Sequence, residues 1–235
     1  MRVDKIRTKQ ETFAVLATSG SGRVLASFSV ALIALRLTVG GAFAWHDLLV
    51  LGVALALVGS VEWIIHLFFL HAPEDAWVSR VLGTGLGHRQ HHLDPPELRW
   101  LLLRWIDALV FTLAFSAVIA SWVVPLMRLT GGSLLGPFLT GWALAAVGLL
   151  HYEWVHLLVH TRYRPRNRYY SRLARNHRLH HFRNERYWLG VTSNSGDRLF
   201  RSYPTNKADV PLSPTARTLN DVLDSPQDST HPRRV

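Results

Sequence analysis

The sequence predicts an all-α integral membrane protein with four transmembrane helices and a histidine-rich helical cap that faces the cytoplasm. Two observations support this fold class. The 235-residue chain is 49% hydrophobic, yet its apolar and basic residues occupy separate blocks, as in membrane proteins with basic flanks. In addition, ten of its thirteen histidines form two clusters with one shared pattern. A basic composition is also typical of nucleic-acid binding, but the long uncharged segments argue against a nucleic-acid partner.

The predicted elements follow in order along the chain. Residues 1–23 carry five Lys or Arg residues and are expected to form a cytoplasmic tail. The four apolar segments comprise residues 24–44, 48–70, 108–127 and 134–150, the last continuing to residue 160. The first is the weakest, because Arg36 would be costly near a bilayer centre. Residues 71–104 are predicted to form a polar loop. The membrane domain should cover 24–203, and 204–235 should have little fixed structure.

The distribution of positive charge predicts the orientation in the membrane. With four spans, both termini and the middle loop share one side. That side carries five Lys or Arg residues in the N-terminal tail, four in the middle loop and fifteen from Thr161 onward, whereas the opposite loops carry only Arg128. Because Lys and Arg accumulate in cytoplasmic segments, both termini and the histidine clusters are expected to be cytoplasmic.

The two histidine clusters share one arrangement. Each begins with a pair at the end of an apolar segment, continues after a gap of equal length, and ends in H-x-x-H-H. The first cluster is His66, His71, His88, His91 and His92, and the second is His156, His160, His177, His180 and His181. Glu-Trp precedes both clusters, as Glu62-Trp63 and Glu153-Trp154. This similarity indicates either an internal repeat of roughly ninety residues or a metal-binding task common to both halves.

The spacing predicts how the pairs converge. Residues three or four apart share a helix face, so His156 and His160 should point together, as should His88, His91 and His92 approximately. His66 and His71 are five apart and need a helix end or a local distortion to converge. Because the chain has no cysteine, any metal must be held by nitrogen or oxygen. Five imidazoles from each half could enclose two metal ions, and imidazole suits iron, zinc, copper and nickel.

Several other polar residues are candidates for supporting the ligands. Glu62 and Glu153 are expected to accept the second N–H of ligand imidazoles, the alternative being solvated or arginine-paired carboxylates. His151 is either a further ligand or a hydrogen-bonded interior histidine. Asn176, Asn194 and Asp197 are further candidates to support the ligands, whereas His46 and His231 are expected to be incidental.

The arrangement H-x(4)-H, H-x-x-H-H, H-x(3)-H, H-x-x-H-H resembles that of the membrane fatty acid hydroxylase and sterol desaturase superfamily, from about Leu48 to Tyr203. The stretch from Asn176 through HRLHH to Trp188, followed by L-G-V-T and G-D-R-L-F, is similar to the C-terminal signature of that superfamily. The resemblance implies an oxygenase whose two metal ions, usually iron, are held by all ten clustered histidines, with no catalytic residue beyond the metal centre. Zinc could replace iron on isolation.

The same resemblance implies that dioxygen attacks a C–H bond of a lipid, with electrons from a separate cytochrome- or ferredoxin-type carrier. Hydroxylation of a fatty acyl chain is the first expectation, and hydroxylation or desaturation of a sterol or carotenoid is the alternative. A zinc-binding membrane protein without redox chemistry, such as a transporter, is less favoured, because transporters place ionisable residues near mid-bilayer.

Two surface features have two interpretations each. The basic cytoplasmic surface could dock an acidic electron carrier or anionic lipid headgroups. The aromatic residues Trp63, Phe68, Phe69 and Trp154 could exclude water from the reaction or anchor the chain at the membrane interface, and anchoring is favoured.

Overall fold

The computed structural model describes residues 1–213, apart from the side chains of residues 82 and 84. All the secondary-structure elements assigned within residues 1–213 are helices or helical turns. The chain divides into two compact units. The helix unit comprises residues 1–59 and 96–164, and the histidine unit comprises residues 60–95 together with the described part of 165–235. His231 and most of the predicted C-terminal tail, residues 214–235, lie outside the described residues.

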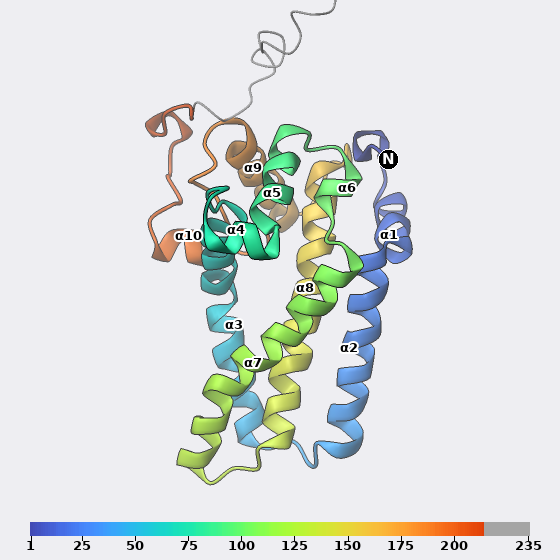
Figure 1. Cartoon of the computed structure of the whole chain (residues 1–235), viewed down its shortest axis with the longest axis vertical. Coiled ribbons are helices and arrows are strands. Elements are labelled where there is room, and N and C mark those ends of the chain that lie inside the picture. Colours follow the sequence, from blue (N-terminus) through green and yellow to red (C-terminus); the bar gives the residue numbers. More distant parts are fainter. Residues whose placement is uncertain (214–235) are drawn as a thin grey trace, which may run out of the picture. The chain divides into compact units, whose positions relative to one another are not determined.

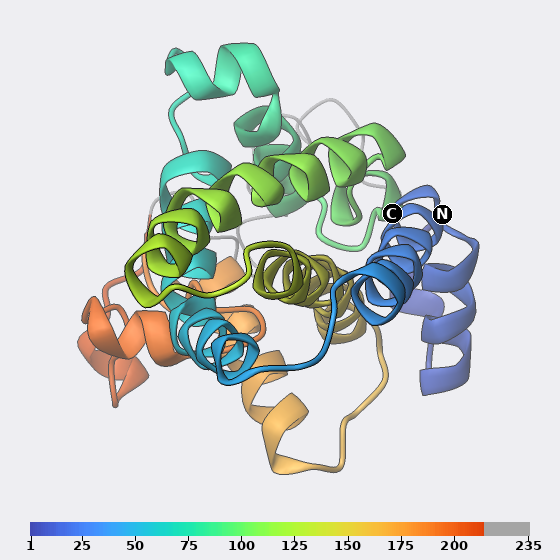
Figure 2. The same ribbon diagram turned by 90° about the horizontal axis from the view of Figure 1, so that it is seen from below.

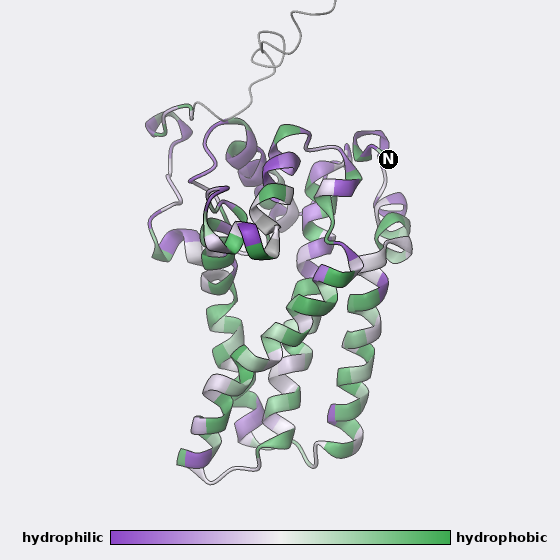
Figure 3. Cartoon of the chain, viewed as in Figure 1, coloured by the Kyte–Doolittle hydropathy of each residue, from purple (hydrophilic) through white to green (hydrophobic). Residues whose placement is uncertain are grey.

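Four long apolar helices confirm the predicted membrane spans (Figure 1). They are α2 (Gly20–Val39), α3 (Trp45–Ile65), α7 (Trp105–Thr130) and α8 (Leu135–His160). α8 packs against both α2 and α7, which also pack against each other, and the view along the helices in Figure 2 shows α8 in the middle of the four long helices. Figure 3 shows that hydrophobic residues dominate the middle of each long helix. Their length and composition suit them to cross a bilayer.

The helix unit has small apolar cores between its helices and an apolar exterior. Leu32 of α2 packs with Leu139, Ala143 and Ala146 of α8. A second cluster joins α3 to α7 through Val50, Ile119, Val123 and Met127. Large apolar side chains also point outward, among them Val30, Leu55 and Leu113. Such an exterior would be unfavourable in water, and it matches the hydrocarbon core of a membrane.

The first span differs from its prediction at both ends. The helix begins at Gly20, because the Ser19 side chain accepts the Gly22 N–H and caps it. It ends at Val39, and Gly41, in a left-handed conformation with φ +74°, lies in the connection to α3. Residues 40–44 are therefore a connection, although their apolar character predicted a continued span.

Arg36 is accommodated by a buried ion pair. Its Nη2 donates to Asp47 Oδ1 at 2.8 Å, and its Nη1 donates to the Gly41 carbonyl at 2.9 Å. Thr140 of α8 donates to the same carboxylate oxygen at 2.6 Å. Arg36 and Asp47 are only 3% and 2% exposed. Pairing thus offsets the cost that an isolated arginine would impose on an apolar segment.

The N-terminal residues pack onto the helix unit. The helix α1 (Lys9–Thr18) begins with a capping box between Thr8 and Glu11. Ahead of it, the 3-10 turn η1 (Val3–Lys5) places Val3 in a buried cluster with Ile6 and with Leu157 of α8. The predicted tail is therefore partly helical and anchored by buried apolar residues.

The histidine unit contains shorter helices. These are the π-helical turn η2 (His66–Leu70), α4 (Trp77–Leu82), α5 (Thr84–Leu93), α9 (Arg168–Phe182), α10 (Ser195–Leu199) and the 3-10 turn η3 (Lys207–Asp209). Residues 71–104, predicted as a polar loop, contain α4, α5 and, in the helix unit, α6 (Leu98–Leu101). The prediction was wrong there, because α5 buries histidines and so lacks the apolar periodicity that identifies a helix. Residues 204–213 are tied down where Asn184 donates to the Pro211 carbonyl and Ser213 to Glu185.

Candidate metal centre

A π-helical turn brings His66 and His71 together. Directly after α3 the backbone forms i→i+5 hydrogen bonds, and the His71 N–H donates to the His66 carbonyl at 3.0 Å. In this geometry residues five apart lie on one face, as residues four apart do in an α-helix. The two imidazole rings accordingly stack at 5.1 Å between centroids. The local distortion that the five-residue spacing required is therefore present.

Each H-x-x-H-H box lies on one short helix. At 3.6 residues per turn, the first and last histidines of the box are about 40° apart around the axis, whereas the last two are about 100° apart. On α5 the rings of His88 and His92 lie 4.7 Å apart. On α9 those of His177 and His181 lie 4.6 Å apart. The middle histidines, His91 and His180, point in other directions, so the expectation that His88, His91 and His92 point together is wrong for His91.

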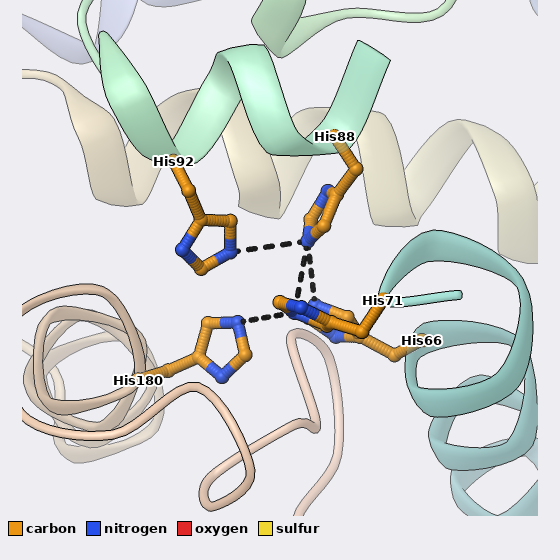
Figure 4. Close-up of side chains that lie close together, drawn as sticks. All are labelled: His66, His71, His88, His92 and His180. Carbon is orange, nitrogen blue, oxygen red and sulfur yellow. Dashed lines mark hydrogen bonds between the residues drawn. The ribbon is translucent and has the colours of Figure 1, made fainter. Parts of the chain in front are cut away.

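Five histidines of the histidine unit converge into a first group, shown in Figure 4. Their ligand nitrogens all lie within 4.8 Å of one another. His88 Nε2 approaches the Nε2 atoms of His66, His92 and His71 at 3.1, 3.1 and 3.2 Å. His71 Nε2 in turn approaches His180 Nε2 at 3.2 Å. The group draws on η2, α5 and α9, and its members are His66, His71, His88, His92 and His180.

These distances fit a metal ion better than a network of hydrogen bonds. Two imidazole nitrogens bound at right angles to one metal, each at about 2.1 Å, lie about 3.0 Å apart. The proton of a single His88 Nε2–H could not serve three neighbouring nitrogens well. The remaining lone pairs would face one another in a buried site, which is unfavourable unless a cation lies between them. The donor set therefore fits a metal ion bound by imidazole.

A second group forms around His91 of α5. Its ring lies 4.7 Å from that of His181, and His181 Nε2 approaches His177 Nε2 at 3.0 Å. His91, His177 and His181 offer ligand nitrogens within 4.8 Å of one another. In the helix unit, His156 and His160 lie one turn apart on α8 with ring centroids 5.1 Å apart, as their spacing predicts.

The spatial groups do not coincide with the clusters read from the sequence. His180, from the second sequence cluster, joins four histidines of the first. His91, from the first cluster, lies with His177 and His181 of the second. Helix rotation within each box causes the exchange, so each box contributes to both groups.

Burial keeps these imidazoles in the form that binds metals. Together with the nearby His66, it lowers the pKa of the His71 imidazole to about 2, burial being the larger cause. Burial also lowers the pKa of His88 well below its usual value, as do the neighbouring histidines, His71 foremost. The neutral imidazole, with a free lone pair, is the state that ligates a metal. Near neutral pH both side chains therefore have a lone pair available to a cation.

Backbone carbonyls orient two ligands of the first group. His66 Nδ1 donates to the carbonyl of Leu189, and His180 Nδ1 donates to that of Tyr187 at 3.0 Å. Because a carbonyl only accepts, the proton of each ring lies on Nδ1. Their Nε2 atoms are left to face the group.

Neither glutamate accepts from an imidazole in the contacts that the structure gives it, contrary to the role expected from the sequence. Glu62 accepts backbone N–H groups from Val191, Thr192 and Ser193 at 2.8–3.2 Å. Glu153, 1% exposed on α8, accepts from Ser21 Oγ at 2.7 Å and from the Leu103 N–H at 3.2 Å. Both carboxylates instead fasten loops to helices that carry histidines. Adjacent sequence positions could not reveal these distant partners.

The remaining candidates have defined surroundings. Asp197, fully buried, accepts the N–H groups of Leu189 and Gly190 at 2.9 and 2.8 Å. Asn176, also fully buried on α9, donates to Asn194 Oδ1 at 3.2 Å. His151 is half-buried on α8. Asp197 thus binds the backbone at Leu189, whose carbonyl accepts from His66, while Asn176 ties α9 to the residue that precedes α10.

The aromatic residues fall into two environments. Trp63 donates to Ser202 Oγ at 2.7 Å and stacks on Phe200 at 4.3 Å, which ties α3 to the segment after α10. Trp154 packs edge-on against Phe13 of α1. Phe68 is 58% exposed. Trp63 and Trp154 therefore have packing partners of their own within each unit.

Two comparisons return nothing: no curated protein and no solved structure matches the chain. A comparison with protein-family models does match, over residues 49–202, to the family described as fatty acid hydroxylase. The matched region includes all ten clustered histidines and three of the four membrane-spanning helices. Since it covers well over half of the sequence, the chain belongs to the fatty acid hydroxylase family.

Proposed function

We propose that this protein is a membrane-bound oxygenase that uses dioxygen and two iron ions to hydroxylate a lipid, a fatty acyl chain being the favoured substrate. All ten clustered histidines would be ligands of the two ions. The first group of five converging imidazoles carries this proposal, because its nitrogen distances fit a bound cation. Membership of the fatty acid hydroxylase family supports both the reaction and the substrate class.

When bound, the pair of redox-active ions would activate dioxygen for attack on an unactivated C–H bond. The protein would contribute binding and shielding. His66 is 1% exposed, yet Ile64 and Phe68 beside it in the sequence are exposed apolar residues. A hydrocarbon chain lying against α3 would meet these side chains next to a ligand. Apolar contacts of this kind suit an acyl chain and keep water from the reacting carbon.

The electron carrier would dock on the arginine-rich face of α9. Arg168, Arg172, Arg175 and Arg178 are exposed along this helix, whereas its histidines are buried. A carrier on that face would lie about one helix diameter, roughly 10–12 Å, from the imidazoles. Complementary charge would draw an acidic cytochrome or ferredoxin to it. Anionic lipid headgroups are the alternative partner of this arginine-rich face.

Metal content and lipid turnover test the proposed function together. The full chain, purified in detergent without chelators under anaerobic conditions, should contain close to two iron ions per chain. Reconstituted with a chemical or protein reductant, it should insert oxygen from ¹⁸O₂ into added fatty acyl lipids, detected by mass spectrometry. Sterol and carotenoid substrates offered in parallel decide between substrate classes.

The opposing outcomes are distinct. Stoichiometric zinc that iron cannot replace, with no turnover after iron loading, would support a non-redox zinc protein. Turnover of a sterol alone would uphold the proposed oxygenase activity and show that its substrate is a sterol and not a fatty acyl lipid. For the docking face, R172E/R175E should raise the KM for an acidic carrier several-fold and leave turnover with a small chemical reductant unchanged. An unaltered KM would assign the arginines to lipid headgroups.

A further inference from the structure

We propose that Asp197 and Glu62 are positioning residues for the first histidine group and that they act through the loop of residues 187–193. Neither would touch the metal. Each would hold one part of this loop, whose backbone carbonyls fix the tautomer and direction of two ligand imidazoles. This inference rests on the proposed function for the presence of a metal, but its test does not depend on oxygenase activity.

The loop presents two carbonyls to two ligands from different elements. The Tyr187 carbonyl accepts from His180 of α9, and the Leu189 carbonyl accepts from His66 of η2. In both rings the proton is thereby held on Nδ1, and Nε2 is turned toward the group. A shift of this loop would release both Nδ1–H donors at once. The rings could then rotate or change tautomer, and two of the five ligands would lose their alignment.

Asp197 holds the loop at Leu189 itself. Its Oδ1 accepts the Leu189 N–H and its Oδ2 accepts the Gly190 N–H, while the Ser202 hydroxyl also donates to Oδ1. Trp188, the residue before, has a left-handed backbone with φ 52° and donates its N–H to the Ser202 carbonyl. Non-glycine residues adopt that conformation only when their surroundings enforce it. Asp197 and Ser202 provide that enforcement.

The turn at Gly190 is too tight for any other residue. A Cβ atom at this position would lie 1.9 Å from the Ser193 carbonyl oxygen and 3.0 Å from Asp197 Oδ2. The loop therefore folds back closely on itself and on the aspartate. Such close packing leaves the Leu189 carbonyl little freedom to move away from His66.

Glu62 holds the far end of the loop to the helix that carries His66. It lies four residues, about one turn, before His66. Its carboxylate accepts the N–H groups of Val191, Thr192 and Ser193 and the Thr192 hydroxyl at 3.0 Å. One helix thus bears both the ligand and the anchor of the loop that orients it. This arrangement fixes the distance between His66 Nδ1 and the Leu189 carbonyl.

Amide substitutions separate positioning from packing. D197N and E62Q keep the side-chain volume but replace one accepting oxygen by an NH₂ group, which would face backbone N–H donors. The matched controls D209N and E74Q make the same changes at exposed carboxylates of the histidine unit. S202A, which removes one donor to Asp197 and the acceptor of the Trp63 N–H, retains both loop contacts of the carboxylate.

Cobalt(II) titration of the detergent-purified apoprotein, followed by visible absorption and metal content, gives the readout. The parent chain should bind two ions. D197N and E62Q should weaken one of the two binding events about 10–100-fold and leave the other unchanged. S202A should have a smaller effect, and the controls none. Loss limited to one site distinguishes positioning from general destabilisation, which would weaken both.

Three results would overturn the proposal. One is parent-like binding of both ions by D197N and E62Q, and another is equal weakening of both sites in S202A, which keeps the contacts of Asp197 with the loop. A parent chain that binds no metal would overturn this proposal and the proposed function together. By contrast, two bound ions and a site-selective loss in D197N, without any lipid turnover, would refute the oxygenase and uphold the positioning role.

Discussion

At the scale of single residues, the rotation of an α-helix explains why H-x-x-H-H serves two groups. His88 and His92 face one way on α5 while His91 faces another, and His177, His181 and His180 repeat this division on α9. Since each box contributes histidines to both groups, α5 and α9 cannot move apart without disturbing both groups. The motif thereby links the two histidine groups through two short helices that have little apolar surface of their own.

Single substitutions should therefore remove the metals separately. H88A deletes the imidazole whose Nε2 approaches three others, so metal content should fall from close to two ions per chain to about one. H177A should remove the other ion, because His177 lies with His91 and His181. Elemental analysis of the purified variants measures both losses.

The control for these variants is H46Q. His46 lies outside both groups and contacts Thr130 Oγ1 at 3.0 Å. Its replacement should leave metal content and turnover at parent levels. If H88A retained both ions, the first group would not be a metal site.

At the scale of elements, the π-helical turn at the end of α3 is the feature on which the first histidine pair depends. A π turn accommodates one more residue than an α turn, so His66 and His71 share a face despite their five-residue spacing. Deleting Phe68, whose side chain is exposed, should convert the turn to α-helix and leave the histidines four apart on one face. Cobalt binding should then survive with an affinity within about tenfold of the parent.

The comparison variant inserts one alanine after Phe68. It would rotate His71 away from His66 by about 100° and should abolish binding at the first group. Both variants change the chain length by one residue, so each alters the length of the segment that leads to α4 by the same amount. Loss of the ion in both would mean that the π turn is not what aligns the pair.

In the helix unit, the buried Arg36–Asp47 ion pair joins three helices, α2, α3 and α8. R36M removes one partner and leaves a buried carboxylate uncompensated, which should cost about 3–5 kcal/mol of stability. The double variant R36M/D47N removes that charge and keeps an oxygen for the Thr140 hydroxyl, so it should recover much of the loss.

Thermal unfolding in one detergent, followed by circular dichroism, ranks the parent, R36M and R36M/D47N. A double variant no more stable than R36M would mean that the contacts of Arg36 with the Gly41 carbonyl and Phe43 outweigh its charge pairing.

The elements differ in how far their sequences predict them. Long uncharged segments predict the four spans, because a bilayer admits few alternatives, and spacing predicts that His156 and His160 share a face. The segment that contains α5 was predicted as a polar loop, since its buried face is histidine and the hydrophobic pattern is absent, although a helical cap was expected. The partners of Glu62 and Asp197 lie on the loop of residues 187–193, 129 residues away for Glu62 and eight or fewer for Asp197. Only the folded chain shows these contacts, because they depend on backbone N–H groups that every sequence has.

At the scale of the whole molecule, charge and apolar surface predict the same placement in the membrane. The long helices carry exposed apolar side chains, while twenty-four of the 26 Lys and Arg residues lie in segments predicted to share one side. Cytoplasmic segments carry such an excess in membrane proteins. We therefore expect both termini and the histidine boxes on the cytoplasmic side, where soluble electron carriers have access.

The absence of cysteine makes this topology directly testable, because any introduced thiol is the only one in the chain. Q10C tests the N-terminal segment and S133C the turn between α7 and α8, and both positions are exposed. A membrane-impermeant maleimide added to intact cells should label S133C and spare Q10C, and inside-out vesicles should reverse the pattern. Detergent-solubilised protein, in which both should react, controls for thiol reactivity. Labelling of Q10C in intact cells would place the N-terminus outside, and labelling of both variants would refute the odd number of spans, three, between them.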